Sequence, residues 1–175
     1  MNFVKFTGEN RFLVSQFQDI YDQRILSKKI SEIKGIKFDI FERNHKISII
    51  NSDIKLTFNC PVSFNEIFSD IQSYLSKYNF RIGTILFYPF NNLLKSDKET
   101  LKLNFIHNII LTSIFLNDGN IQKEMLYKLV WPNDYDTSVN KLDTHFTNLK
   151  ELVKLKFNID LVLKSNQGLV SLTIN

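Results

Sequence analysis

A long apolar stripe runs along residues 63–78 and limits the folds open to this chain. Its apolar side chains recur at spacings of three and four residues, which places them on one face of a helix. Ser63 and Glu66 have the spacing of a capping box, and Val62 and Ile67 occupy the staple positions around it. A stripe this wide needs a cover from the same domain or from a partner. Its members are Phe64, Ile67, Phe68, Ile71, Tyr74, Leu75 and Tyr78.

The segment before this helix predicts a small α/β domain with antiparallel strands. Short polar joints separate three strand-like segments, and such joints suit hairpins, whereas parallel neighbours need a long crossover. We therefore expect an antiparallel meander rather than repeated βαβ units. The expected elements are an apolar run at residues 2–6, helices at 10–21 and 25–33, and strands at 36–41, 46–50 and 54–58.

The remainder of the chain predicts a sheet, three helices and a final hairpin, which is the order of a winged helix-turn-helix. The whole chain is thus of the α+β class, and we expect one domain over residues 1–80 and another over 81–175. The expected strands are 82–88, 92–95 and 100–103. The expected helices are 104–116, 122–131 and about 137–156, and two strands flank Asn166-Gln167-Gly168.

Composition excludes several classes of protein. Hydrophobic residues make up 43% and aromatic residues 13% of the chain, which is too apolar for a disordered protein. A single cysteine, Cys60, excludes an internal disulfide and fits a reducing, cytoplasmic compartment. No apolar run reaches the length of about 18 residues that a membrane span needs. The net charge of +4 is compatible with a nucleic-acid partner without requiring one.

The third expected helix of the second domain has two distinct faces. Its apolar residues form a core face, and its polar residues gather on the other side, with His145 and Lys150 at the flanks. Such a helix fits the major groove of duplex DNA, where lysine and asparagine side chains bond phosphates or base edges. The core face is Val139, Leu142, Phe146, Leu149 and Val153, and the polar face is Asn140, Lys141, Thr144, Thr147, Asn148, Glu151 and Lys154.

Residues 82–174 resemble the OmpR/PhoB-type DNA-binding domain of bacterial response regulators. The resemblance rests on several short matches in register, none of which is specific alone. They are Leu103-Asn104 before the first helix, Gly119 at its end, Lys123-Glu124-Met125-Leu126 with Leu129-Val130-Trp131, Leu142-Asp143-Thr144-His145-Phe146 with Leu149-Lys150, and Gly168 in the hairpin. The chain departs from the family in having no arginine on the third helix.

The resemblance implies a sequence-specific transcription regulator that binds double-stranded DNA as a homodimer. It places DNA contacts on the third helix and on the wing hairpin, and it places the loop Asn133–Asp136 where relatives contact RNA polymerase. The implied DNA contacts are Asn140, Lys141, Thr144, His145, Thr147, Asn148, Lys150, Lys154, Lys164, Ser165 and Asn166. The implied dimer face is Phe64, Ile67, Phe68, Ile71 and Tyr74 on the apolar stripe.

The N-terminal domain would be a degenerate or replaced receiver. Asn59-Cys60-Pro61 precedes the striped helix where a receiver has Lys-Pro, but Cys60 replaces the lysine. The acidic pair that a receiver carries after its first strand is also missing, since Thr7-Gly8-Glu9-Asn10 stands there. We therefore expect no phosphotransfer and no Mg²⁺ site.

The residues do not suggest an enzyme. His45, His107 and His145 show no ligand spacing with Cys60, so we expect no metal, no cofactor and no catalytic residue. The alternative function is a protein-interaction adaptor that keeps the winged-helix fold without binding DNA. The absence of arginine from the third helix motivates this alternative, and salt-dependent DNA affinity separates the two.

Overall fold

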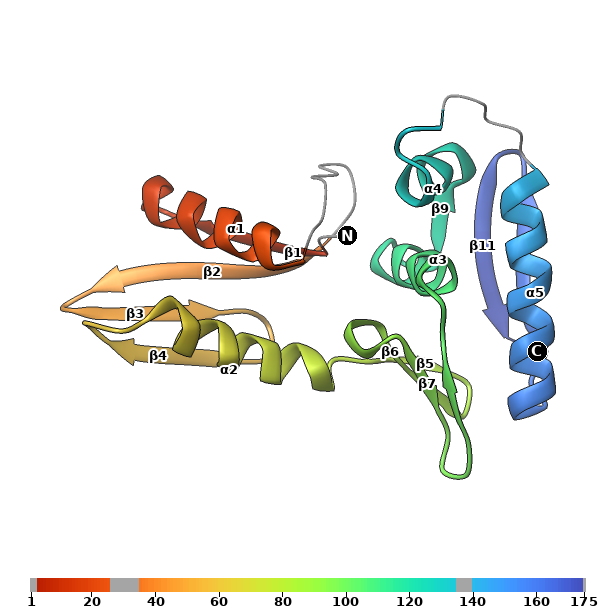
Figure 1. Ribbon diagram of the computed structural model, residues 1–175, viewed down its shortest axis with the longest axis horizontal. Helices are drawn as coiled ribbons and strands as arrows, with labels where there is room; N and C mark the ends of the chain where they lie inside the picture. Colours follow the sequence, from red (N-terminus) through yellow and green to blue (C-terminus); the bar gives the residue numbers. More distant parts are fainter. Residues whose placement is uncertain (1–2, 26–34, 135–139, 175) are drawn as a thin grey trace. The chain divides into compact units, whose positions relative to one another are not determined.

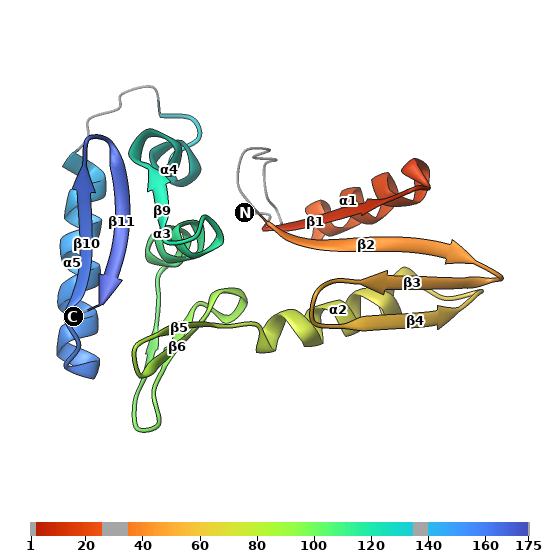
Figure 2. The same cartoon turned by 180° about the vertical axis from the view of Figure 1, so that it is seen from behind.

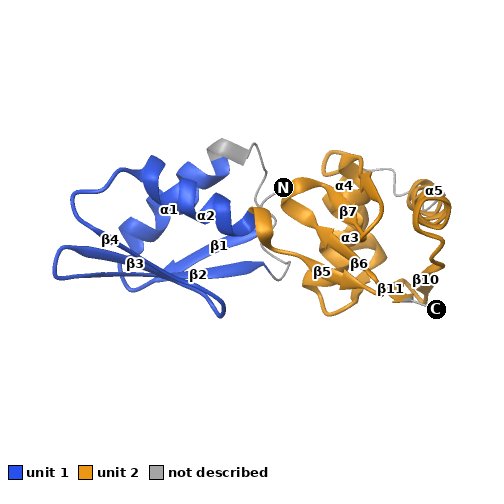
Figure 3. Cartoon of the chain, turned by 90° about the horizontal axis from the view of Figure 1, so that it is seen from below, with its two compact units in different colours: residues 1–75 blue, residues 76–175 orange. Residues whose placement is uncertain are grey.

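The computed structural model of the chain describes residues 3–25, 35–134 and 140–174. It divides into two compact units, residues 1–75 and 76–175 (Figure 3). The division falls earlier than the expected boundary after Phe80. Residues 76–80 belong with the second unit because the Asn91 side-chain amide donates to the Ser76 carbonyl at 2.9 Å, and the Tyr78 ring packs on Phe80 and Phe90. The expected helix over 25–33 lies almost entirely outside the described residues.

The N-terminal unit is a four-stranded sheet of order β1-β2-β3-β4 with two helices (Figure 1). The strands β2, β3 and β4 form the expected antiparallel meander. The expectation of antiparallel strands alone is wrong at the edge, where β1 pairs with β2 in parallel because the long connection through α1 crosses over the sheet. The elements are β1 (Val4–Gly8), α1 (Arg11–Ile25), β2 (Ile36–Arg43), β3 (Lys46–Ile50), β4 (Lys55–Asn59) and α2 (Phe64–Lys77).

Aromatic side chains fill the core of the N-terminal unit. The Phe6 ring of β1 packs against Phe17 of α1, Phe38 of β2 and Phe68 of α2, with ring centroids 5.6 to 6.3 Å apart. Ring pairs at these separations add to the free energy gained from burial alone. The helix α2 begins as expected, since the Ser63 hydroxyl accepts a hydrogen bond from the Glu66 backbone N–H at 3.2 Å.

The side chain of Gln18 protects the outer edge of this sheet. Among the described strands, β1 pairs with β2 on one side only, so some backbone groups of its other edge need partners from outside the sheet. From α1, the Gln18 amide oxygen accepts a hydrogen bond from the Phe6 N–H at 3.1 Å, and the amide nitrogen donates to the Val4 carbonyl at 3.3 Å. One side chain thus takes the place of a further strand.

The C-terminal unit begins with an antiparallel sheet of order β5-β6-β7-β8. A single strand was expected over 82–88, but the chain turns back within it. Gly83 has a φ of 59°, and Ile82 pairs with Ile85 across a two-residue turn that needs this left-handed conformation. The elements are β5 (Phe80–Ile82), β6 (Ile85–Tyr88), the 3₁₀ turn η1 (Pro89–Asn91), β7 (Leu93–Lys95) and β8 (Thr100–Lys102).

The helices α3, α4 and α5 follow, with a short strand between the first two and a hairpin at the end. The Asn104 side chain caps α3 by accepting from the His107 N–H at 2.8 Å, as the sequence predicts. The strand β9 was not foreseen, and β11 pairs with both β10 and β9 (Figure 2). The elements are α3 (Phe105–Leu116), β9 (Asn120–Gln122), α4 (Lys123–Val130), α5 (Asn140–Phe157), β10 (Leu161–Asn166) and β11 (Leu169–Ile174).

The fold class is α+β, and α3 forms the centre of the C-terminal unit. Its residues Ile109, Ile110, Leu111 and Ile114 are buried, and it contacts α4, α5, β9 and β11. The Asn108 side chain donates to the Pro89 carbonyl at 3.1 Å, which ties α3 to η1. Among the described residues, no helix combines the length and the apolar character that crossing a membrane requires.

We predict that Gln18→Leu lowers the free energy of unfolding by about 1–3 kcal/mol, because two backbone groups of β1 lose their partner. The decrease would be measured as an earlier midpoint in urea, followed by circular dichroism. Gln16→Leu is the matched control, since Gln16 lies on the same helix without these bonds. Equal midpoints for the two variants would contradict the role given to Gln18.

Candidate nucleic-acid interface

Four apolar side chains fix α5 on the C-terminal unit. Leu142, Phe146, Leu149 and Val153 recur at three and four residues, and each is at most 4% exposed. They turn toward α3 and β10, which are among the elements that α5 contacts. The sequence prediction of this core face is confirmed for these four residues, while Val139 lies outside the described residues. The opposite face of α5 is consequently turned outward.

The outward face of α5 brings together most of the residues expected to contact DNA. Lys141, Thr144, Thr147, Asn148 and Lys154 are exposed, and His145 and Lys150 at the flanks are half-buried. The backbone of Asn140 begins the helix, but its side chain lies outside the described residues. A single helix therefore presents two threonines, an asparagine and two lysines from which a partner's polar surface could be reached.

The hairpin β10–β11 presents the other expected contacts. Gln167 and Gly168 have φ angles of 48° and 79°, so the strands are joined by a tight two-residue turn that needs left-handed backbone at both positions. Lys164, Ser165 and Asn166 lead into this turn and are exposed. The turn is held against the start of α4, where the Lys123 N–H donates to the Gly168 carbonyl at 2.7 Å.

Ion pairs neutralise part of the positive charge of this surface. The Lys141 ammonium lies 2.6 Å from the Asp134 carboxylate, and that of Lys154 lies 2.6 Å from Asp160. Lys150 and Lys164 have no ion-pair partner in the part of the chain that the structure describes. Two of the four lysines expected to bind phosphates are thus available without breaking an existing pair.

A carboxylate before α5 links it to α4. The Asp134 carboxylate accepts hydrogen bonds from the Tyr127 hydroxyl at 2.9 Å and from the Lys141 ammonium at 2.6 Å. Burial and the bond to Asp134 raise the pKa of Tyr127, and the same carboxylate raises the pKa of Lys141. Asp134 belongs to the loop expected to meet RNA polymerase, but here it binds its own unit. Tyr135 and Asp136 lie outside the described residues.

One ion pair beside this surface was not predicted from the sequence. The Lys123 ammonium at the start of α4 lies 2.8 Å from the Asp143 carboxylate on α5. Lys123 and Asp143 stand twenty positions apart in the sequence. Side-chain pairs on one helix stand three or four positions apart, so no local pattern signals this contact. Together with Asp134, this pair fixes the first turns of α5 against α4.

Two histidines and a tryptophan pack under the flank of α5. The His145 ring lies 5.7 Å from the His107 ring of α3 and 5.7 Å from the Trp131 ring after α4. His107 is 2% exposed, and neither of its ring nitrogens has a hydrogen-bond partner among the described residues. Burial lowers the pKa of both histidines, and His145 lowers that of His107 further. This cluster favours neutral imidazoles.

The residues expected to form a dimer face belong to the core of the N-terminal unit. Ile67, Phe68 and Ile71 are at most 4% exposed in the single chain. The Phe64 ring packs 5.0 Å from that of Phe17, and the Tyr74 hydroxyl donates to the Asp53 carboxylate at 2.8 Å. The sheet and α1 of the same unit therefore cover this stripe, which leaves little of it for a second chain.

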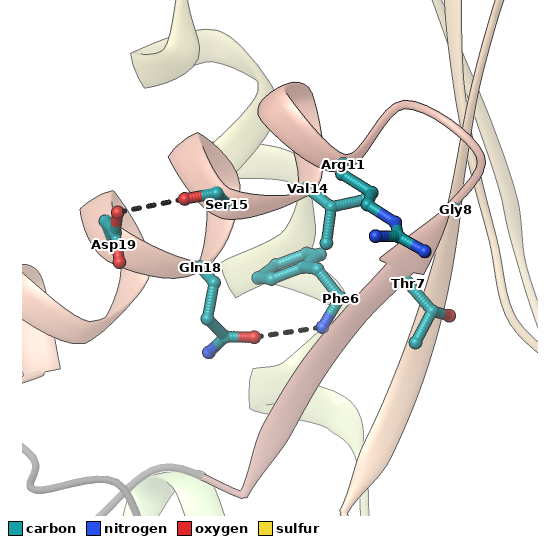
Figure 4. A pocket seen from close by; sticks show the side chains of 8 residues that line it. All are labelled: Phe6, Thr7, Gly8, Arg11, Val14, Ser15, Gln18 and Asp19. Atoms are coloured by element: carbon teal, nitrogen blue, oxygen red, sulfur yellow. Dashed lines mark hydrogen bonds between the residues drawn. The ribbon is translucent and has the colours of Figure 1, made fainter.

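An open groove of about 400 Å³ lies between β1 and α1 (Figure 4). Its lining includes Arg11, whose guanidinium points toward Thr7 and Gly8. The lining contains neither a histidine nor a cysteine. The Ser15 hydroxyl donates to Asp19 at 3.3 Å, and the Thr7 hydroxyl donates to Asp39. Within the described residues, no three His, Cys, Asp or Glu side chains group as metal ligands would. We assign no catalytic chemistry to the groove.

Comparison with known proteins identifies no relative of this chain. No family model matches the chain, and no curated protein or solved structure matches it either. The contacts of α5 and of the hairpin are therefore the basis on which a function is assigned.

We predict that acid destabilises the C-terminal unit through His107. Its pKa is lowered in the folded chain, so the unfolded chain binds more protons as the pH falls below about 6.5. The contribution of His107 to stability is then fully present above its pKa in the unfolded chain. It is lost as the pH falls toward its lower pKa in the folded chain. The urea concentration at the unfolding midpoint should decrease as the pH is lowered from 7 to 5. The substitution His107→Phe should make this decrease smaller.

His45→Asn is the control for this prediction, because it removes a histidine from the exposed turn after β2. Asparagine also tolerates the φ of 58° at that position. The role of His107 is refuted if the pH dependence of His107→Phe matches that of the unaltered chain.

Proposed function

We propose that the C-terminal unit is a winged-helix DNA-binding domain, and that the chain regulates transcription by binding specific duplex sequences. The observation that carries the proposal is the outward polar face of α5 beside the exposed hairpin turn. The order of elements supports it, since three helices are followed by a hairpin whose strand β11 also pairs with β9. The resemblance to OmpR/PhoB-type domains over residues 82–174 points the same way.

In this proposal α5 enters the major groove. The Asn148 amide has the donor and acceptor needed to bond adenine, and the methyl group of Thr144 suits thymine. Lys150 reaches a phosphate or a guanine, and Lys164 and Ser165 on the hairpin reach the sugar–phosphate backbone. The Thr147 hydroxyl is already bonded to the Asp143 carbonyl at 3.0 Å, so its methyl group is the part offered to a base.

Charge on this face implies modest affinity for DNA of arbitrary sequence. Lys141 and Lys154 are paired, and Glu151 is an exposed acid on the same face. Fewer phosphate contacts release fewer counterions, so binding depends less steeply on salt. Specific base contacts must then supply a large share of the affinity.

The N-terminal unit supports regulation without phosphorylation. A phosphorylatable receiver needs a parallel sheet and an acidic pair after its first strand, whereas β2, β3 and β4 are antiparallel and Thr7-Gly8 ends β1. A homodimer would set two α5 helices on two half-sites. Since α2 buries its stripe within one chain, such a dimer would use another surface. Contact of the Asn133–Asp136 loop with RNA polymerase remains part of the proposal.

The second candidate is a protein-interaction adaptor with the same fold. It is favoured by two exposed apolar side chains on the outer surface of α5, Leu152 at 38% and Leu155 at 87% exposed. An apolar pair on a helix suits a protein partner better than a phosphate backbone. Binding of duplex DNA separates the two candidates.

We predict that Asn148→Ala with Lys150→Ala lowers the affinity for a duplex selected from a random pool by about tenfold or more. Lys164→Ala should weaken binding to all duplexes alike and reduce the slope of log affinity against log salt by about 1. Both effects would be measured by fluorescence anisotropy over a salt series, after circular dichroism has shown that the variants fold.

Lys98→Ala is the matched control, because Lys98 carries the same charge on an exposed turn between β7 and β8. It should leave affinity and salt slope unchanged. If the unaltered chain selects no duplex even at low salt, the adaptor function replaces DNA binding.

A further inference from the structure

The two helices of the N-terminal unit lie on the same side of its sheet (Figure 3). Alternate residues of the strands face these helices, and Phe38, Ile40, Ile49 and Phe58 are buried there. The strand residues between them point to the other side, which no described element of this unit covers. We call this side the open sheet face.

The open sheet face is strongly basic. Residues 1–75 carry 10 lysines and arginines against 9 acids, so the unit as a whole is nearly neutral. The open sheet face holds half of these cations and one of the acids, Asp39, which already accepts a hydrogen bond from the Thr7 hydroxyl. The cations are Lys5, Lys37, Arg43, Lys46 and Lys55.

The cations stand at both ends of the open sheet face. Arg43 and Lys46 are directly opposite each other in the β2–β3 register, beside the tight turn Asn44-His45. Lys37 lies six residues before Arg43 on β2, which is about 20 Å along a strand. Like charges directly opposite each other destabilise a sheet. The Arg43–Lys46 arrangement therefore weakens the unit alone and suits an anionic partner.

An aromatic side chain lies between the two basic ends. Phe41 is 36% exposed on the open sheet face, unlike the buried phenylalanines of the other side. Ser48 and Thr57 continue its row across β3 and β4, with their hydroxyls 3.3 Å apart. The row thus offers a ring face and hydroxyl groups, with cations within reach on either side.

We propose that the open sheet face binds single-stranded nucleic acid. An open sheet face can support unstacked bases, with one base on an aromatic ring and phosphates on cations. Phe41 stacks a base, Arg43 with Lys46 binds phosphates at one end, and Lys37 binds them at the other. This site belongs to the N-terminal unit, and it does not depend on the duplex binding proposed for α5.

The test measures binding of the full chain to a labelled oligothymidylate of about 12 nucleotides, a length within the usual site size. Phe41→Ala should lower the affinity about tenfold, which is within the range for loss of one stacked base. Lys37→Ala with Arg43→Ala and Lys46→Ala should lower it further and make the salt dependence less steep. All of these side chains are exposed, and circular dichroism would verify the folding of each variant.

Two controls make the outcome specific to this surface. Lys150→Ala with Lys164→Ala, on the C-terminal unit, should leave single-strand affinity unchanged, while the Lys37, Arg43 and Lys46 variant should leave duplex affinity unchanged. Polyglutamate of equal charge should compete poorly because it offers no base to Phe41. The proposal is overturned if the chain does not bind the oligothymidylate at low salt, if the sheet variants bind it normally, or if polyglutamate competes equally well.

Discussion

The anchoring of α5 determines what the C-terminal unit can present to a partner. Leu142, Phe146, Leu149 and Val153 are buried against the rest of the unit, which fixes the rotation of the helix about its own axis. The same constraint turns Thr144 and Asn148 outward. Removing any of the buried side chains would leave a cavity and loosen this orientation. A polar face has value for recognition only when its direction is fixed in this way.

Polar pairing then sets the electrostatic character of that face. The Asp134 carboxylate accepts a hydrogen bond from Tyr127 and pairs with Lys141, and Lys123 pairs with Asp143. These bonds fix the beginning of α5 and also neutralise part of its charge. Ion pairs at exposed positions contribute little stability each. For the proposed binding of duplex DNA their effect is larger, because a paired lysine attracts a phosphate less strongly. The open sheet face of the N-terminal unit differs, because its five cations share that face with a single acid, Asp39.

Local patterns predicted most elements, and contacts between distant residues account for what they missed. Apolar periodicity and caps predicted α2, α3 and the core face of α5, since these depend on residues three or four positions apart. The parallel pairing of β1 and the strand β9 depend on partners far along the chain, which no local pattern specifies. The alternation of Lys37 and Phe38 was visible, but the open side of the sheet depends on where both helices pack.

The central claim, that α5 and its hairpin form a DNA-reading surface, is tested most directly by residue-resolved NMR of the ¹⁵N-labelled full chain. Spectra would be recorded with and without a selected duplex. The account predicts that the amide signals of Thr144, Asn148 and Lys150, and those around Lys164, shift on binding, while those of β5–β8 change little. Shifts confined to other surfaces, or none at saturating duplex, would contradict it.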